Sequence, residues 1–254
     1  MKQLRSPVLS LFPGIDLLGR AFESVGFPVV RGPDPALGQG DIRNFHLTGV
    51  FSGVMGGSPC QDFSKARRDP PSGEGLEMLA QFERIVLEVG PDWWLLENVP
   101  SVPELRIDGY THQRIDLKAS EFGLKQRRLR HFQFGTVGNE ILVVDRGPVT
   151  HATEPCCMAS EGERASRRSF ADFCELQGLP RDFDIPYFTQ SAKYRAVGNG
   201  VPLPMGRALA LSIAFNLFEP WEVRVCACGC GRRVTGKQQS ATVGCRKRLE
   251  RRRA

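Results

Sequence analysis

The sequence predicts an α/β fold in which a parallel β-sheet is covered by helices on both faces. Short apolar runs typical of buried strands alternate along the chain with segments whose apolar residues recur at helical spacing. Gly and Pro residues that favour turns separate these segments. The polar residues best suited to chemistry follow the ends of predicted strands, which is where open α/β sheets bind their ligands.

The expected elements lie mainly in the first half of the chain. The strands cover residues 8–12, 29–30, 50–55, 93–96 and 131–134, and the early helices cover residues 17–25 and 76–89. Between residues 136 and 168 the pattern weakens into short pieces. Hydrophobic order returns at 170–179 and again at 202–217, which we expect to be largely helical. With 254 residues, the chain has room for one α/β domain and a small appendage.

The net charge of +6 is concentrated towards the C-terminal end. Residues 224–254 contain ten Lys or Arg and one acidic residue, a local charge of +9 that leaves −3 for residues 1–223. A basic tail suits a polyanion such as nucleic acid, although cationic tails also bind membrane surfaces. No stretch approaches the ~20 apolar residues that cross a bilayer, and no signal-like segment opens the chain. We therefore expect a cytoplasmic protein whose eight cysteines are thiols, a nucleophile or metal ligands rather than disulfides.

The sharpest feature is the segment Gly57-Ser58-Pro59-Cys60-Gln61-Asp62-Phe63-Ser64. It puts a cysteine on a turn after a strand, beside a proline that stiffens the backbone, which is a suitable position for a nucleophile. A lone cysteine in such a place would more simply be a buried structural residue. The motifs that accompany Cys60 favour the nucleophile.

Five motifs follow one another in an informative order. They are Phe12–Gly14, Pro59–Gln61, Glu97–Pro100, Gln126–Arg130 and Gly198–Pro202. This series resembles the cytosine-5 DNA methyltransferases over roughly residues 8–215, and the combination of Pro-Cys-Gln, Glu-Asn-Val and Gln-x-Arg-x-Arg is highly specific. The resemblance implies the class I S-adenosylmethionine-dependent methyltransferase fold, a Rossmann-like doubly wound sheet, in a compact enzyme of the bacterial or phage type.

The chemistry of that family explains why these residue types occur together. Carbon-5 of cytosine is a poor nucleophile until a thiolate adds to carbon-6, and the resemblance assigns this addition to Cys60. Glu97 would stabilise the negative charge that enters the ring, by contacting N3 and the exocyclic amine. Arg128 and Arg130 would bind the O2 edge and hold Glu97. Cys60 needs a lowered pKa or loss of its proton during attack, and the cytosine must be flipped out of the duplex.

The same resemblance implies a set of residues that bind S-adenosylmethionine, with Phe12 packed on adenosine, Asp34 on the ribose and Asp41 on adenine. The set comprises Phe12, Gly14, Ile15, Asp34, Asp41, Ile42, Pro59, Asn199 and Val201. The chain departs from the family at Asp16 and Leu17, where glycines are usual, and at Ser58, where a second proline is usual. Asp16 can cap the following helix, and its carboxylate would oppose a phosphate there, which argues against a dinucleotide.

A variable region reads the DNA sequence in this family, and here it is only residues 136–186. We expect residues 1–135 and 187–221 to form the catalytic domain of a monomer, and residues 222–254 to form a basic Cys-rich tail. The expected contacts with double-stranded DNA are Gln61, Ser64, Gln126, Arg164, Arg167 and Arg168. So small a recognition region implies a short or loosely specified DNA target sequence.

The tail contains Cys226, Cys228, Cys230 and Cys245, whose four thiolates could complete a tetrahedral zinc site. Their spacing is tighter than the usual Cys-x₂-Cys, and the tail has no histidine. Four cysteines in so short a segment are nevertheless far above background, so we predict bound zinc. The alternative is a disordered basic tail with incidental cysteines.

Three other functions stay open from the sequence. An RNA cytosine-5 methyltransferase, such as the transfer-RNA enzymes related to this family, would share the core and a reduced recognition region. A DNA-binding relic without turnover would have no reason to keep Cys60, Glu97, Arg128 and Arg130 together. Transfer of a modified group in place of methyl is the third. The lack of a nuclease segment favours a solitary modifying enzyme, and a partner restriction enzyme, as in restriction-modification, is left open.

Overall fold

The computed structural model describes residues 6–34, 38, 40–64, 70–147, 149–217, 246–247 and 250–251. The chain divides into two compact units, residues 1–213 and 214–254. The first unit contains the whole sheet and all the residues predicted for the catalytic and cofactor sites.

A six-stranded sheet forms the centre of the first unit, in the order β2-β1-β3-β4-β6-β5. Its strands are β1 (Val8–Leu11), β2 (Val29–Arg31), β3 (Gly53–Gly57), β4 (Trp93–Asn98), β5 (Gln113–Lys118) and β6 (Leu129–Thr136). The first four strands pair in parallel, whereas β6 is antiparallel to both β4 and β5. The predicted parallel α/β sheet is therefore confirmed for β1 to β4, and β6 makes the complete sheet mixed. A short connection joins β5 to β6, which antiparallel pairing permits.

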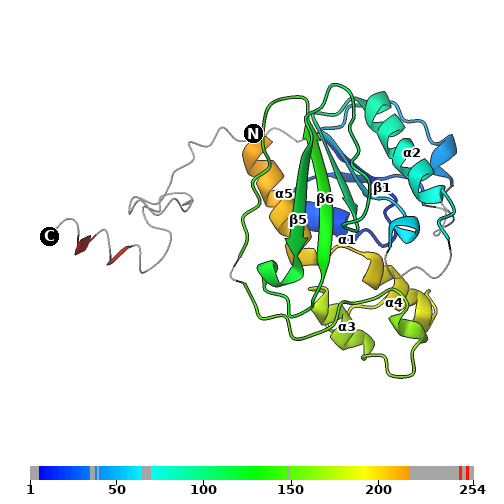
Figure 1. Ribbon diagram of the computed structural model, residues 1–254, viewed down its shortest axis with the longest axis vertical. Coiled ribbons are helices and arrows are strands. Elements are labelled where there is room, and N and C mark those ends of the chain that lie inside the picture. Colours follow the sequence, from blue (N-terminus) through cyan, green and yellow to red (C-terminus); the bar gives the residue numbers. More distant parts are fainter. Residues whose placement is uncertain are drawn as a thin grey trace. The chain divides into compact units, whose positions relative to one another are not determined.

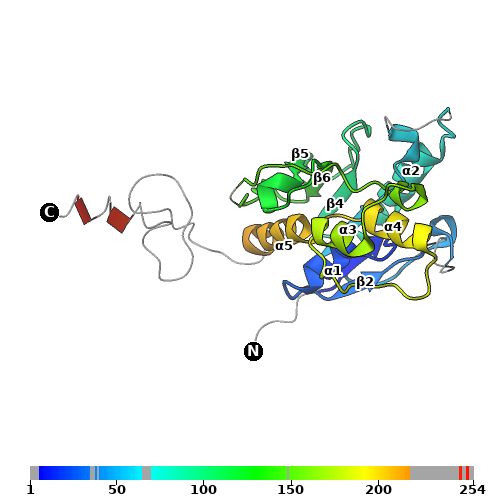
Figure 2. The same cartoon turned by 90° about the horizontal axis from the view of Figure 1, so that it is seen from below.

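Helices cover both faces of this sheet (Figure 1). The α-helices of the described residues are α1 (Leu17–Glu23), α2 (Glu74–Val89), α3 (Phe170–Leu176), α4 (Gln190–Asn199) and α5 (Leu203–Leu217), of which α3 and α4 lie beyond one end of the strands (Figure 1). The two views agree that α2 lies on one face, with α1 and the first part of α5 on the other (Figure 2). No helix in the described part of the chain combines the length and apolarity needed to span a membrane.

Two adjacent tryptophans on β4 connect the sheet to the helices on its two faces, because successive side chains of a strand point in opposite directions. Trp94 packs edge-on against Phe82 of α2 with ring centroids 6.2 Å apart, and Trp93 stacks on Phe22 of α1 at 5.9 Å. Both indoles are fully buried. Gly53 on β3 provides the space for Trp93, since a Cβ there would collide with the indole ring.

Strand β3 lies later in the sequence than the predicted strand at 50–55. It begins at Gly53 and continues through Gly56 and Gly57, the residues expected to end it. A Cβ at Gly56 would lie 2.7 Å from the backbone oxygen of Leu11, and a Cβ at Gly57 would lie 2.9 Å from a carboxylate oxygen of Glu97. Glycine is needed at these two positions of β3 because the neighbouring strands β1 and β4 approach too closely for a side chain.

A second apolar cluster lies around α3 and α4. Its buried members are Leu17, Cys157, Phe173, Cys174, Leu179, Tyr194 and Val197. The Tyr194 ring lies 4.8 Å from that of Phe173 and 5.3 Å from that of Phe170. The cluster draws on the expected recognition region and on the segment after it, so these two parts of the chain pack together.

Candidate active site

The turn between β1 and α1 forms one wall of the site. Phe12 and Asp16 both adopt left-handed backbone conformations, with φ of 52° and 55°. The Asp16 carboxylate accepts hydrogen bonds from the backbone N–H of Gly19 and from Ser10 Oγ, both at 2.9 Å, so Asp16 caps α1 as predicted. Arg31 Nε lies 2.8 Å from the other Asp16 carboxylate oxygen. These contacts hold a backbone conformation that a residue other than glycine rarely adopts.

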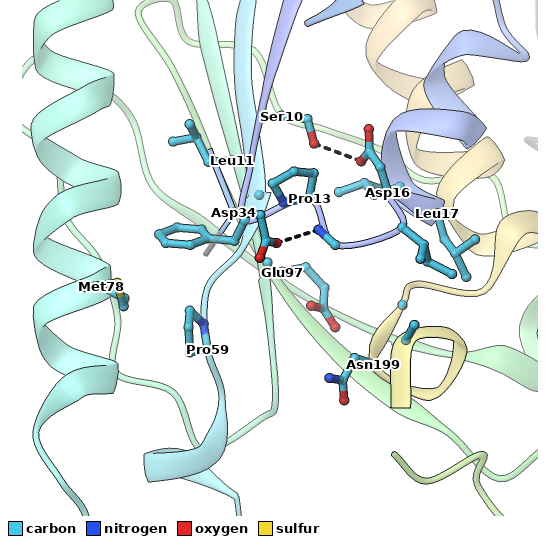
Figure 3. A pocket seen from close by; sticks show the side chains of 18 of the residues that line it. Ser10, Leu11, Pro13, Asp16, Leu17, Asp34, Pro59, Met78, Glu97 and Asn199 are labelled. Carbon is cyan, nitrogen blue, oxygen red and sulfur yellow. Dashed lines mark hydrogen bonds between the residues drawn. The ribbon is translucent and has the colours of Figure 1, made fainter. Parts of the chain in front are cut away.

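A cavity of about 480 Å³ opens beside this turn, which is within the usual range for a small-molecule site. Its wall contains all nine residues predicted to bind the cofactor, Phe12, Gly14, Ile15, Asp34, Asp41, Ile42, Pro59, Asn199 and Val201. Figure 3 shows Asp34, Glu97 and Asn199 around the same space, with Pro59 and Met78 on another side of it. The fold therefore brings together residues that are far apart in the sequence.

Two carboxylates at this cavity were assigned to the nucleoside part of the cofactor. Asp34 Oδ2 accepts a hydrogen bond of 2.7 Å from the backbone N–H of Gly14 (Figure 3). Asp41 accepts from the backbone N–H of Arg43 at 2.9 Å and from its Nη1 at 2.8 Å, and Arg43 Nε continues to Glu77 of α2 at 2.6 Å. These backbone and side-chain bonds from Arg43 lower the pKa of Asp41. Asp41 is therefore held as an anion that can accept from an amine.

The cavity wall also contains residues that the sequence analysis did not select. They include Arg43, Glu74, Met78, Phe188, Ala192, Arg195 and Ala196. A signal for part of this set was present: Ala192, Ala196 and Asn199 recur at helical spacing, so a helix that directs Asn199 into the cavity directs the other two there as well.

Cys60 is the third residue after the end of β3 and the N-cap of η3 (Gln61–Phe63), one turn of 3₁₀ helix. Its φ of −103° and ψ of 2° lie in the bridge region, where many active-site residues are found. Burial and the charge of Glu97 raise the pKa of the half-buried thiol, and they outweigh the opposing effect of Arg130 and Arg128. Of the two routes expected from the sequence, loss of the thiol proton during attack is therefore favoured over a lowered pKa.

Glu97 lies near the end of β4, opposite Gly57 of β3, and its side chain reaches the cavity wall. Only 8% of the residue is exposed. Burial raises the pKa of Glu97, against the opposing effect of Arg130 and Arg128. The carboxyl group therefore keeps its proton to a higher pH than an exposed glutamate, which suits an acid that must interact with a ring nitrogen.

The two arginines of the Gln-x-Arg-x-Arg motif do different things. Arg130 Nε lies 2.8 Å from Glu97 Oε1, as predicted. Arg128 is 3% exposed and donates instead to the backbone oxygens of Cys157 at 2.9 Å and of Gly198 and Gly200 at 2.8 Å. Arg130 therefore holds Glu97, whereas Arg128 does not, and base binding by either arginine stays a prediction. The two terminal nitrogens of Arg128 donate to backbone carbonyl groups, its buried Nε has no hydrogen-bond partner in the described part of the chain, and its effect on Glu97 is through charge.

Gln126 is also internal, although it was predicted to contact DNA. It is fully buried, and its Nε2 donates to the Leu176 oxygen and, at 2.8 Å, to Gln177 Oε1. Its Oε1 accepts from the backbone N–H of Cys157 at 3.3 Å. The structure corrects the prediction because every polar atom of this amide is satisfied within the protein.

Among the three arginines predicted to read DNA, Arg168 differs from the other two. Its Nη2 lies 2.5 Å from Glu161 Oε2, and its guanidinium carbon lies 5.5 Å from the centre of the Phe173 ring. Arg168 is thus half-buried and takes part in the packing around α3, and its contact with DNA stays a prediction. Arg164 and Arg167 are exposed, as is Gln61, and Ser64 is half-buried. These four residues stay candidates for DNA binding, and all except Ser64 are more accessible than Arg168.

The predicted zinc ligands Cys226, Cys228, Cys230 and Cys245 lie outside the described residues. Within the described part of the chain, no group of three or more His, Cys, Asp or Glu side chains is placed to hold a metal ion. The cysteines described there, Cys60, Cys156, Cys157 and Cys174, are free thiols.

Comparison with known proteins agrees with these motifs. Residues 35–155 match the model of the C-5 cytosine-specific DNA methylase family. The Type II methyltransferase M.HgiDI of Herpetosiphon aurantiacus is 36% identical over 158 residues, which cover 50% of this chain and 51% of the relative. The Type II methyltransferase M.HgiGI of the same organism is 32% identical over 112 residues, which cover 36% of this chain and 88% of the relative. The chain thus spans about half the length of M.HgiDI and about a third or less of the length of three further curated relatives.

Solved structures of much lower sequence identity share the fold. The Entamoeba histolytica methyltransferase EhMeth has a TM-score of 0.65 at 13% identity, covering 85% of this chain and 100% of that one. Dnmt2 of S. pombe has a TM-score of 0.56 at 13% identity, covering 82% of this chain and 98% of that one. Together with the mixed sheet, these likenesses confirm the predicted class I methyltransferase fold.

Proposed function

Because the chain belongs to the C-5 cytosine-specific DNA methylase family, we propose that it transfers a methyl group from S-adenosylmethionine to carbon-5 of cytosine in duplex DNA. One observation carries the proposal. The cavity that begins at the Phe12 turn has Pro59, Gln61 and Glu97 in its wall, so it extends to both neighbours of Cys60 and to the buried acid. A methyl donor bound along this cavity would end beside the groups that activate the base.

The residues around the cavity fit S-adenosylmethionine. Asp34 and Asp41 offer carboxylate oxygens to ribose hydroxyls and to the adenine amine, and Phe12, Ile42 and Met78 offer apolar surface to the adenine ring. The buried Asp16 carboxylate caps α1, where a phosphate would otherwise bind, and the methyl donor has no phosphate. When bound, S-adenosylmethionine supplies an electrophilic methyl group on a positively charged sulfur.

The chain's own residues would activate the base as follows. Cys60 Sγ bonds to carbon-6 and loses its proton during the attack, which makes carbon-5 nucleophilic. Glu97, held by Arg130, interacts with N3 and the exocyclic amine and compensates the charge that enters the ring. After carbon-5 has taken the methyl group and lost its proton, the bond to Cys60 breaks and the aromatic ring and thiolate are restored. These steps require a base outside the stack.

Two findings support DNA as the substrate. The matching family is described as a DNA methylase, and the relatives are described as Type II methyltransferases. The rival is RNA, and neither the small recognition region nor the basic tail separates the two. Labelled methyl transfer to duplex DNA and to transfer RNA, measured side by side, should give product with DNA. Product with transfer RNA alone would replace this proposal with the RNA enzyme.

A covalent adduct tests the chemistry directly. The protein is incubated with S-adenosylmethionine and a random-sequence duplex containing 5-fluorocytosine, from which the carbon-5 substituent cannot leave as a proton. We expect a stable protein–DNA adduct with the parent and with the control Cys156→Ser, which changes another half-buried thiol. Cys60→Ser should form none. An adduct of equal yield with Cys60→Ser would exclude Cys60 as the nucleophile.

We further propose, from the sequence, that the enzyme acts as a monomer in the cytoplasm and that the tail binds zinc through Cys226, Cys228, Cys230 and Cys245. Four thiols in a short segment support zinc, because thiolates are its preferred ligands. Metal analysis of the full chain should find one zinc per molecule, and a variant with these four cysteines changed to serine should have none. Full-length protein without zinc after purification in metal-replete buffer would remove this part of the proposal.

A further inference from the structure

The turn that carries the nucleophile, residues 58–64, has few backbone bonds of its own. The Phe63 N–H donates to the Cys60 oxygen at 3.1 Å, and the Ser64 N–H donates to the Gln61 oxygen at 3.3 Å. Cys60 itself has bridge-region backbone angles, which are sparsely populated and persist where surrounding contacts enforce them. Side chains within the turn make further contacts with neighbouring elements.

Ser58, two residues before Cys60, connects the turn to the end of β4. It is 4% exposed, and Asn98 Nδ2 donates to its hydroxyl at 2.9 Å and to its backbone oxygen at 3.1 Å. The Asn98 amide is oriented in turn by the Val99 N–H, which donates to Asn98 Oδ1 at 2.8 Å. The Ser58 hydroxyl therefore fixes the chain on the N-terminal side of Cys60 relative to the strand that carries Glu97.

Asp62, two residues after Cys60, connects the turn to the first residues of α2. One carboxylate oxygen accepts from the Ser72 N–H at 2.8 Å and from its hydroxyl at 3.1 Å, and the other accepts from the Gly75 N–H at 2.8 Å. The N-cap of α2 is Gly73, which has no side chain to cap the helix, so Asp62 supplies that cap from a distance. Hydrogen bonds from Gly75 and Ser72 lower the pKa of Asp62, so it remains an anion.

The approach of the turn to α2 is close. A Cβ at Gly75 would lie 3.0 Å from Asp62 Cβ and from the Phe63 ring, so the absence of a side chain at Gly75 permits the contact. On the other side, Ser101 Oγ donates to the Phe63 backbone oxygen. The two ends of the turn are thus attached to two separate elements, β4 and α2, both of which are anchored in the core of the sheet.

We propose that Ser58 and Asp62 are positioning residues for the nucleophile, and that their hydrogen bonds to Asn98 and to the N-terminus of α2 aim the Cys60 thiol at the base. The inference rests on the proposed function, since attack by the thiol is the step that this geometry serves. A displacement of about 1 Å in a reacting group can cost on the order of a hundredfold in rate. Neither side chain needs to touch the substrate to have this effect.

Three substitutions separate positioning from general damage. Ser58→Ala removes the hydroxyl that accepts from Asn98, and we expect adduct formation to slow about tenfold. Asp62→Ala removes the contacts with Ser72 and with Gly75 of α2 and should slow adduct formation about a hundredfold. Asp62→Asn keeps one accepting oxygen and should fall between Asp62→Ala and the parent. The dissociation constant for S-adenosylmethionine should stay within about twofold in all three, because the cofactor residues are untouched.

The experiment measures single-turnover adduct formation with the 5-fluorocytosine duplex and, separately, S-adenosylmethionine binding by calorimetry. Asp108→Asn is the matched control, because Asp108 is an exposed carboxylate in the loop after β4. Ser72→Ala is the milder variant if Asp62→Ala does not fold, because Ser72 is exposed and its hydroxyl contacts Asp62. It should slow adduct formation severalfold, and in an Asp62→Ala background it should add nothing.

The outcomes distinguish this inference from the function on which it rests. If the parent forms no adduct, the proposed function fails first. If the parent forms the adduct and Ser58→Ala, Asp62→Ala and Ser72→Ala form it equally fast, the positioning role is excluded. Parallel loss of adduct formation and of S-adenosylmethionine binding would also overturn it, since that result indicates a damaged fold rather than a misdirected thiol.

Discussion

The two sides of the candidate site use similar polar residues for different purposes. On the β3–β4 side, Glu97 lines the cavity and its Arg130 partner holds it there. On the α3–α4 side, Arg128 and Gln126 are buried and bond to backbone groups of the protein. Arg130 belongs to the same motif as Arg128 and Gln126, so a motif alone does not distinguish a residue that serves the site from one that supports the fold. Part of the Gln126–Arg130 motif therefore also joins segments in the interior of the protein.

Glu97→Gln should have the largest effect on activity. Loss of the acid should lower the rate of methyl transfer about 10²–10⁴-fold. The charge of Glu97 contributes, after burial, to the raised pKa of Cys60, so its removal should lower that pKa and shift alkylation of Cys60 by iodoacetamide to lower pH. In the parent, alkylation should increase with pH towards the raised pKa, because the thiolate reacts. An unchanged alkylation profile would contradict the electrostatic coupling.

Arg128→Met and Arg130→Met test the division between the two arginines. Arg128→Met leaves the backbone oxygens of Cys157, Gly198 and Gly200 without their donor, and the free energy of unfolding should fall by about 3 kcal/mol. Arg130→Met should cost less stability and should instead abolish most activity, because Glu97 loses its partner. Urea denaturation and methyl-transfer assays are carried out on both variants. A larger loss of stability in Arg130→Met than in Arg128→Met would contradict this division of roles.

Gln126→Ala should act on stability and leave DNA binding unchanged. The substitution removes the amide that joins the segments at Cys157 and Leu176, so we expect a loss of about 1–3 kcal/mol in the free energy of unfolding. DNA affinity is measured at two salt concentrations, under conditions in which the variant stays folded. Weaker binding with full stability would restore the original assignment of Gln126 as a DNA contact.

The exposed arginines should give the smallest effects. Arg164→Ala and Arg167→Ala should weaken DNA binding and reduce the slope of log affinity against log salt by about 1 each, without loss of stability. Arg168→Ala is the matched comparison, because its guanidinium is paired with Glu161. It should change stability more than the salt slope. A salt slope that responds to Arg168 and not to the other two would reverse this assignment.

The sequence predicted most of the sheet but missed one strand. β5 has a residue pattern that is largely polar, and of its members Ile115 and Leu117 are the buried apolar residues. It forms an edge of the sheet, where one face and one side need no apolar cover, so the apolar run that identified the other strands is absent. The two-residue alternation of Ile115 and Leu117 was the available signal.

The sequence by itself predicted the chemistry: the order of the motifs marked Cys60, Glu97 and the nine cofactor residues. The fold then brings Glu97, those nine residues and both chain neighbours of Cys60 to one cavity. Their positions follow from a rule of local structure, since the ends of parallel strands meet at one edge of the sheet. Only the tertiary structure showed that Arg130, and not Arg128, pairs with Glu97. The partners of Arg128 include Gly198 and Gly200, which lie 70 and 72 residues away. Long-range packing creates these partners, and no local pattern in the sequence records them.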